Sequence, residues 1–146
     1  MAITTNATLA VPSTGSSTNF TWVNAQVLTS SAQTVGLVGF AGISQVTIYA
    51  KTTSVTGTSP TLDLYIQKLL ADGLTWQDIA HFSQITSATG RVISMVTGGN
   101  KEEAQQSAAL AAATVNAVAF GGTWRLNAVI AGTSPSFTLS VYVEAQ

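Results

Sequence analysis

The chain has no cysteine and few charged residues, and each shortage excludes a class of protein. Without cysteine there is neither a disulfide framework nor a thiolate metal site. Charged residues make up 8% of the 146 residues, and the net charge is -1. Nucleic acids and anionic membranes are bound through a basic patch, which 5 scattered cations do not provide. Neither is expected as a partner.

Residues 1–50 contain no charged residue and no histidine. A secretory signal has positive residues ahead of an apolar stretch, and the Thr/Ser-rich opening has neither, so we expect no signal peptide. No segment has the roughly 18 consecutive apolar residues that cross a bilayer. A solitary soluble domain usually has about a quarter of its residues charged. We therefore expect copies of this chain, or another protein, to cover much of the surface; a low-charge monomer is the alternative.

The tetrapeptide Gly-Thr-Ser-Pro occurs twice, at residues 57–60 and, 75 positions later, at 132–135. Each copy is followed by alternating apolar and polar residues, which is typical of a β-strand. The alternation places residues 62, 64 and 66, and equally 137, 139 and 141, on one face. Glycine accepts a positive φ and proline fixes φ near −65°, so we predict a turn at each tetrapeptide, with the same β-hairpin used twice.

The same alternation predicts about eight strands, at residues 20–29, 34–40, 46–52, 62–67, 76–82, 91–96, 123–130 and 136–144. The Asp72-Gly73 pair predicts a tight turn between two of them. The fold class is all-β: an antiparallel β-sandwich or jelly roll at residues 20–146, preceded by an extended N-terminal arm at residues 1–19. The Ala-rich segment 101–113 is interpreted as either a short helix or an irregular excursion.

Residues with catalytic chemistry are few and isolated. His81 is the only histidine and has no partners at metal-ligand spacing, so we interpret it as a strand-surface or interface residue. We expect Asp72 to form a turn and Asp78 to be solvated. No Gly-x-Ser-x-Gly motif is present. The sequence therefore predicts no enzyme, no metal site and no cofactor.

Aromatic residues either fill the core or form a face that binds sugars. Trp124 shares a face with apolar neighbours and is expected in the core, whereas Tyr65 and Tyr142 lie opposite the apolar sets of their strands. The candidate partner contacts are Phe20, Trp22, Tyr65 and Tyr142.

Four stretches, GTSPTLDLYIQ, IAHF, RVISMVTGG and WRLNAVIAGTSPSFTLSV, resemble small virion proteins of tailed bacteriophages, of the type found among auxiliary head proteins. The resemblance covers roughly residues 45–143 and leaves the N-terminal arm aside. It implies a β-rich fold, no enzymatic activity, and assembly on a shell as many copies. It also implies the major capsid protein as partner and a homo-oligomer, with a trimer favoured.

Two functions are consistent with these observations. The first is a capsid decoration or cement protein, made in the host cytoplasm and located in the virion, whose arm adds to a neighbouring sheet by β-augmentation. The alternative is a glycan- or receptor-binding module of a head or tail fibre, which would use outward-facing tyrosines and tryptophans. A hydrolase has no motif in its favour.

Overall fold

The computed structural model describes residues 18–34, 36–38, 42–96, 109–116 and 120–146, and in these ranges the chain is all-β. The eight strands belong to one antiparallel sheet. They are β1 (Thr18–Leu28), β2 (Ala32–Gln33), β3 (Leu37–Val38), β4 (Gln45–Leu69), β5 (Trp76–His81), β6 (Thr89–Val96), β7 (Thr114–Val115) and β8 (Thr123–Ala145). Across the described ranges there is no helix, and hence none long and apolar enough to cross a membrane.

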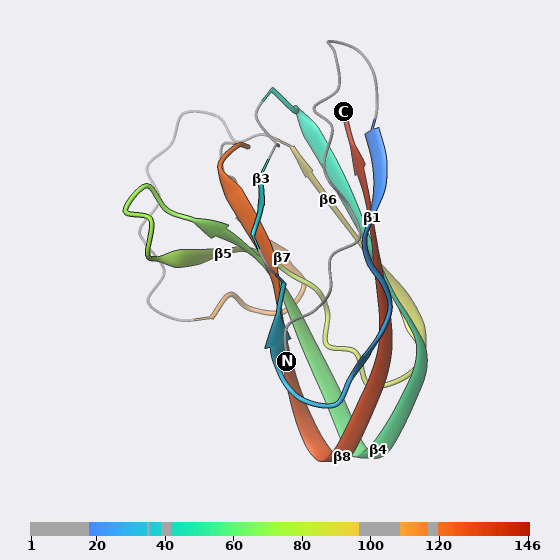
Figure 1. The fold of residues 1–146 in the computed structure, drawn as a ribbon. Helices are drawn as coiled ribbons and strands as arrows, with labels where there is room; N and C mark the ends of the chain where they lie inside the picture. Colours follow the sequence, from blue (N-terminus) through green and yellow to red (C-terminus); the bar gives the residue numbers. More distant parts are fainter. Residues whose placement is uncertain (1–17, 35, 39–41, 97–108, 117–119) are drawn as a thin grey trace.

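The two longest strands, β4 and β8, organise the whole sheet. They have 25 and 23 residues and pair with each other along nearly their full lengths. Figure 1 shows both strands bending together at one end of the molecule, so that their halves lie in two layers. The first layer consists of β1, residues 136–145, residues 45–56 and β6; the second consists of β2, β3, residues 123–131, residues 61–69, β5 and β7. The arrangement is that of a β-sandwich.

The Gly-Thr-Ser-Pro repeats form this bend, and the predicted hairpin turns at residues 57–60 and 132–135 are wrong. Both tetrapeptides lie inside long strands and interrupt the β4–β8 ladder with shifts of register. Gly57 has φ +112° and Ser59 has φ +49°. Glycine with positive φ and proline without an N–H suit a β-bulge as well as a turn. Each strand therefore bends and continues instead of reversing.

The two copies are related by a local two-fold axis. Thr58 pairs with Thr133, its own counterpart in the other copy. On one side Val55 pairs with Phe137, and on the other Leu62 pairs with Ile130, which is the same pair with the copies exchanged. The φ angles also match, because Gly132 has φ +118° and Ser134 has φ +49°. The repeat is a structural element that pairs with itself.

The core lies between the two layers and follows the predicted alternation. The first layer contributes the buried side chains of Val46, Ile48, Ala50, Phe137, Leu139, Val141 and Val143. The second contributes Leu62, Leu64, Ile66, Trp124, Leu126 and Ala128. Successive side chains of a strand point to opposite faces, so the intervening residues of β4 and β8 face outward.

Three further expectations concern the connections. The Asp72-Gly73 turn is confirmed, because β4 ends at Leu69, β5 begins at Trp76, and the Asp72 carboxylate accepts hydrogen bonds from the amides of Leu74 and Thr75. Residues 101–108 of the possible helix lie outside the described residues, and residues 109–113 are not helical. Residues 1–17 of the predicted arm also lie outside them, whereas residues 18 and 19 begin β1.

Candidate binding surface

A row of exposed side chains crosses the outer face of the first layer. Tyr49 of β4 pairs with Val92 of β6 on one side and with Tyr142 of β8 on the other. Thr21 of β1 pairs with Tyr142 and extends the row to the fourth strand. The exposed fractions are 58% for Val92, 41% for Tyr142 and 39% for Tyr49, although all three are large apolar residues. Solvent therefore meets an aromatic and aliphatic strip on this face.

The neighbouring row, two residues along each strand, is polar. Glu144 pairs with Asn19 of β1 and with Thr47 of β4. The Thr47 and Ser94 hydroxyl oxygens are 3.2 Å apart. The Glu144 carboxylate accepts a hydrogen bond of 3.1 Å from the side-chain amide of Gln146. The carboxylate of Glu144 and the side-chain amide of Asn19 thus lie in the row next to the two tyrosine rings.

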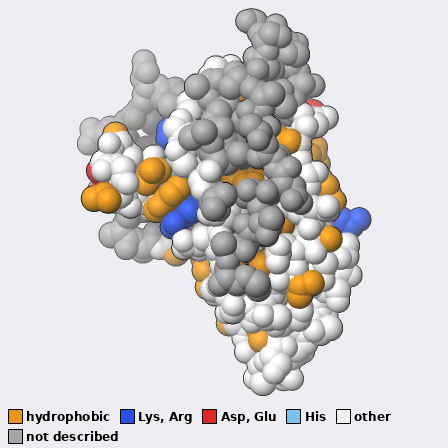
Figure 2. All heavy atoms as spheres, viewed as in Figure 1, with side chains coloured by type: hydrophobic (Ala, Val, Ile, Leu, Met, Phe, Trp, Pro, Cys, Tyr) orange, Lys and Arg blue, Asp and Glu red, His pale blue; other side chains and the backbone are white. Residues whose placement is uncertain are grey.

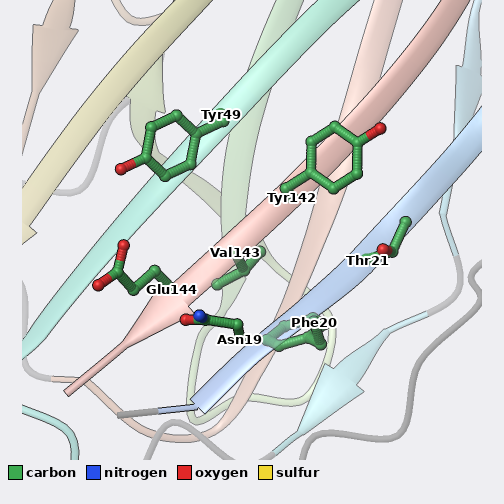
Figure 3. Close-up of a pocket in the computed structure, with 7 residues that line it drawn as sticks. All are labelled: Asn19, Phe20, Thr21, Tyr49, Tyr142, Val143 and Glu144. Atoms are coloured by element: carbon green, nitrogen blue, oxygen red, sulfur yellow. The ribbon is translucent and has the colours of Figure 1, made fainter.

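The two rows border an open hollow of about 330 Å³, lined by Asn19, Phe20, Thr21, Tyr49, Tyr142, Val143 and Glu144. We call it the tyrosine hollow. Figure 3 shows the two tyrosine rings nearly face-on over neighbouring strands, with Glu144 and Asn19 in the adjacent row. The residues come from β1, β4 and β8, which pair in register at this point. The sheet therefore fixes the backbone positions from which these side chains project before any ligand is present.

The outer face of the second layer has a different character, because its charged groups Asp63, Asp78 and Arg125 bind other groups of the chain. His81 is 4% exposed, and its ring stacks on Tyr65 with centroids 3.9 Å apart. Its Nε2 lies 3.2 Å from a carboxylate oxygen of Asp63, and its Nδ1 lies 2.7 Å from the carbonyl oxygen of Leu110. The interpretation of His81 as a strand-surface or interface residue is therefore wrong for an exposed surface position, because the segment that contains Leu110 covers the ring; an interface with another molecule stays a prediction.

Asp78 is also buried, contrary to the expectation that it is solvated. One carboxylate oxygen accepts a hydrogen bond from the side-chain amide of Gln67, and the other accepts one from the backbone N–H of Leu110. Gln67 in turn accepts a hydrogen bond from Nε of Arg125, whose guanidinium lies 4.1 Å from the centre of the Trp76 ring. The cluster fastens residues 109–116 to the sheet and leaves the Asp78 carboxylate little contact with solvent.

This packing shifts the pKa values of two side chains of the second layer, Tyr65 and Arg125. The pKa of Tyr65 is raised, first by burial and then by the negative charges of Asp63 and Asp78. The pKa of Arg125 is lowered by burial, an effect that the charge of Asp78 opposes. Tyr65 therefore remains neutral to a higher pH than an ordinary tyrosine. Within the described residues, no group of three or more metal-ligating side chains is present.

Of the four candidate contacts, only Tyr142 presents an exposed ring in the tyrosine hollow. Phe20 also lines the hollow, but it is partly buried and packs against the core. Trp22 is 0% exposed and belongs to the core, so its ring is not available to a partner. Tyr65 lies on the second layer, against His81. Sequence reasoning missed Tyr49, Asn19 and Glu144 as companions of Tyr142; alternation places Tyr49 on an outer face but does not give its register against β8.

Comparison with protein-family models, with curated proteins and with solved structures finds no match to this chain. The geometry above is therefore the basis of the functional argument.

Proposed function

We propose that the protein is a non-enzymatic structural component of a phage virion, which decorates the capsid by binding major capsid protein subunits and bridging neighbours. The observation that carries the proposal is the uncharged edge strand β1. It has 11 residues, none of them charged, and it pairs with β8 along one side. In the part of the chain that the structure describes, no strand pairs with its other side.

An edge strand of this kind can pair with a strand of another chain. Soluble proteins usually protect an edge strand with charged residues, proline, a bulge or a covering segment. Here β1 has a bulge near Ala25, where the ladder shifts register and φ is +46°, but it has no charge and exposes 48% of Val27. A capsid subunit that added a strand to β1 would satisfy its free backbone groups.

The low charge of the remaining surface favours another protein as the partner over a highly charged molecule. Figure 2 shows few Lys, Arg, Asp or Glu side chains on the face in view, and the end of the molecule where β4 and β8 bend is almost entirely uncharged. Asp63, Asp78 and Arg125 bind groups within the chain. Fully desolvated charges at an interface are costly unless they are paired, so an uncharged surface suits burial against protein.

The proposal includes the finer features expected from the sequence. Residues 1–19 would form an arm that reaches a neighbouring subunit, and the first residues of β1 would continue its pairing. The two-layer sheet would be a jelly roll, and the protein would assemble as a homo-oligomer. Repetition over a shell would strengthen each modest contact through avidity.

Co-sedimentation with capsid shells assembled from the major capsid protein of the same phage tests the proposal. A Val27→Lys variant places a charge on the β1 edge and should sediment with shells at least about tenfold more weakly, since an unpaired charge at an interface costs several kcal/mol. The matched control is Val129→Lys, because Val129 has a similar exposure of 42% and lies on the second layer. It should bind as the unmodified protein does.

Truncation gives a second readout. A chain that begins at residue 18 keeps β1 whole, whereas removal of residues 18 and 19 would also shorten the strand. The truncated chain should fold and lose capsid occupancy. Full occupancy of both the truncated chain and Val27→Lys would overturn the proposal, as would failure of the unmodified protein to bind the shells.

A further inference from the structure

We infer that the tyrosine hollow is a binding site for an uncharged saccharide. The inference goes beyond the proposed function and does not depend on it, since the hollow and the β1 edge are tested by separate variants. It uses two aromatic ring faces, one carboxylate and one amide, which converge from three paired strands.

The aromatic part of the hollow suits the apolar face of a sugar ring. Tyr49 and Tyr142 are exposed by 39% and 41%, and their rings lie flat over the sheet in Figure 3. Small-molecule sites are lined mainly by apolar and aromatic side chains, with a few polar groups that fix the orientation of the ligand. A pyranose offers the matching pair of surfaces, because its C–H groups form a flat apolar face and its hydroxyl groups lie at the rim.

The polar groups of the hollow select for hydroxyl donors. The carboxylate of Glu144 accepts hydrogen bonds only, and the side-chain amide of Asn19 both donates and accepts. Vicinal hydroxyl groups of a sugar can donate to the first and exchange hydrogen bonds with the second. Thr21 adds a hydroxyl group on the same side, from the strand that also holds Asn19.

The charge of the lining excludes the main alternatives. Glu144 is the only charged residue among the seven that line the hollow, so phosphate, sulfate and acidic sugars would meet repulsion, and none of the seven supplies a compensating cation. A wholly apolar ligand would desolvate the carboxylate without offering it a hydrogen-bond donor. The volume of about 330 Å³ is near the lower end of the roughly 300–1,000 Å³ typical of small-molecule sites.

The site is also preorganised. Tyr49 and Tyr142 are direct partners on the two central strands of the layer, and Glu144 and Asn19 are direct partners in the next row. Strand pairing already fixes the backbone at these four positions, so a ligand has to order only their side chains. A hollow made of loops would not have this advantage.

The test is an NMR titration of the full chain, labelled with ¹⁵N, against four uncharged trisaccharides built from glucose, mannose, galactose and N-acetylglucosamine. At least one should shift the amide signals of residues 19–21, 49 and 142–144. Tyr142→Ala should weaken that binding about tenfold or more, since a ring contact is worth roughly 1.4 kcal/mol. Tyr142→Phe should keep most of it, because the ring face remains.

Two controls separate binding from folding. Tyr65→Ala removes a tyrosine from the second layer and should leave saccharide affinity unchanged. Glu144→Gln keeps the shape of the side chain but replaces a carboxylate oxygen with an N–H donor, and should weaken binding severalfold. Absence of shifts with all four trisaccharides would overturn the inference. So would shifts that lie elsewhere, or shifts that persist equally in Tyr142→Ala.

Discussion

Thr58 and Thr133 face each other across the β4–β8 ladder, and each occupies the same place in its copy of the repeated tetrapeptide. The pair marks the local two-fold axis on which both long strands bend. Because the two layers share these strands, the geometry at this one point determines how the layers face each other across the core.

Gly57→Ala should therefore be strongly destabilising. Gly57 has φ +112°, a region that L-residues rarely adopt, and an added Cβ would lie 2.7 Å from the carbonyl oxygen of Ser134. Strain of this kind costs about 1–3 kcal/mol, and the contact with backbone adds to it. Gly132→Ala should behave alike, since its Cβ would lie 2.8 Å from the carbonyl oxygen of Ser59. Urea unfolding monitored by tryptophan fluorescence measures both.

Gly90→Ala is the matched control for this series. Gly90 lies in β6, and a Cβ there would meet no heavy atom within 4 Å. Its free energy of unfolding should change by no more than about 0.5 kcal/mol. Equal stability of the Gly57→Ala and Gly90→Ala variants would show that the bend does not have the described geometry.

Trp22→Phe should cost less stability than Trp124→Phe. Both indoles are 0% exposed, but Nε1 of Trp22 is buried without a hydrogen-bond partner among the described residues, whereas Nε1 of Trp124 donates to the carbonyl oxygen of Gly121 at 3.2 Å. Phenylalanine removes an unpaired donor in the first case and a satisfied one in the second. The difference should be about 1 kcal/mol in the free energy of unfolding. A larger loss for Trp22→Phe would contradict the assignment.

The turn at Asp72 should contribute a pH-dependent part of the stability. Hydrogen bonds from the Thr75 hydroxyl, the Thr75 amide and the Leu74 amide lower the pKa of Asp72 below its ordinary value of 3.8. A carboxyl whose pKa is lowered by folding stabilises the protein above its unfolded pKa, and that stabilisation is lost as the pH falls through the folded pKa. Asp72→Asn should therefore flatten the acid limb of a plot of unfolding free energy against pH.

The cause of the shift can be checked separately. Thr75→Val removes the hydroxyl donor at nearly constant volume and should raise the pKa of Asp72 in an NMR titration of its carboxyl carbon. Thr75→Ser keeps the donor and should leave the pKa close to that of the unmodified protein. Identical values in the two variants would exclude the hydroxyl as the main cause.

Sequence patterning predicts the longer strands and their inner faces, but it misses β2 and β7, gives 34–40 where the described residues form only Leu37–Val38, and does not show how the strands connect. The alternation of Val46, Ile48 and Ala50, and of Leu62, Leu64 and Ile66, identifies buried positions correctly because every second residue of a strand shares a face. The turn at the tetrapeptide is predicted wrongly because glycine and proline serve a bulge equally well. The choice depends on whether residues 46–56 pair with residues 61–69 or with β8, which local sequence does not determine.

Prediction of the candidate site from sequence is limited in the same way. Tyr142 is predicted to face outward from the alternation of its own strand, and it does. Its partner Tyr49 becomes visible only when the register of β4 against β8 is known. The alternation around Trp22 does not show which face of the strand is buried. In the structure the ladder shifts register between Thr21 and Val23. As a result, the consecutive residues Trp22 and Val23 are both buried. Asp78 and His81 are covered by residues far away in the sequence.

The central position of β8 determines when the chain can fold during its synthesis. β8 pairs with β1, β2, β3 and β4, so neither layer can form its central ladder until residues 123–145 are available. Contacts between such distant segments slow folding, and unpaired strands are prone to aggregate while they wait. In a nascent chain on the ribosome, β1 and β4 lack their shared partner β8 until that strand has left the exit tunnel. Early chaperone binding is therefore an advantage for this topology.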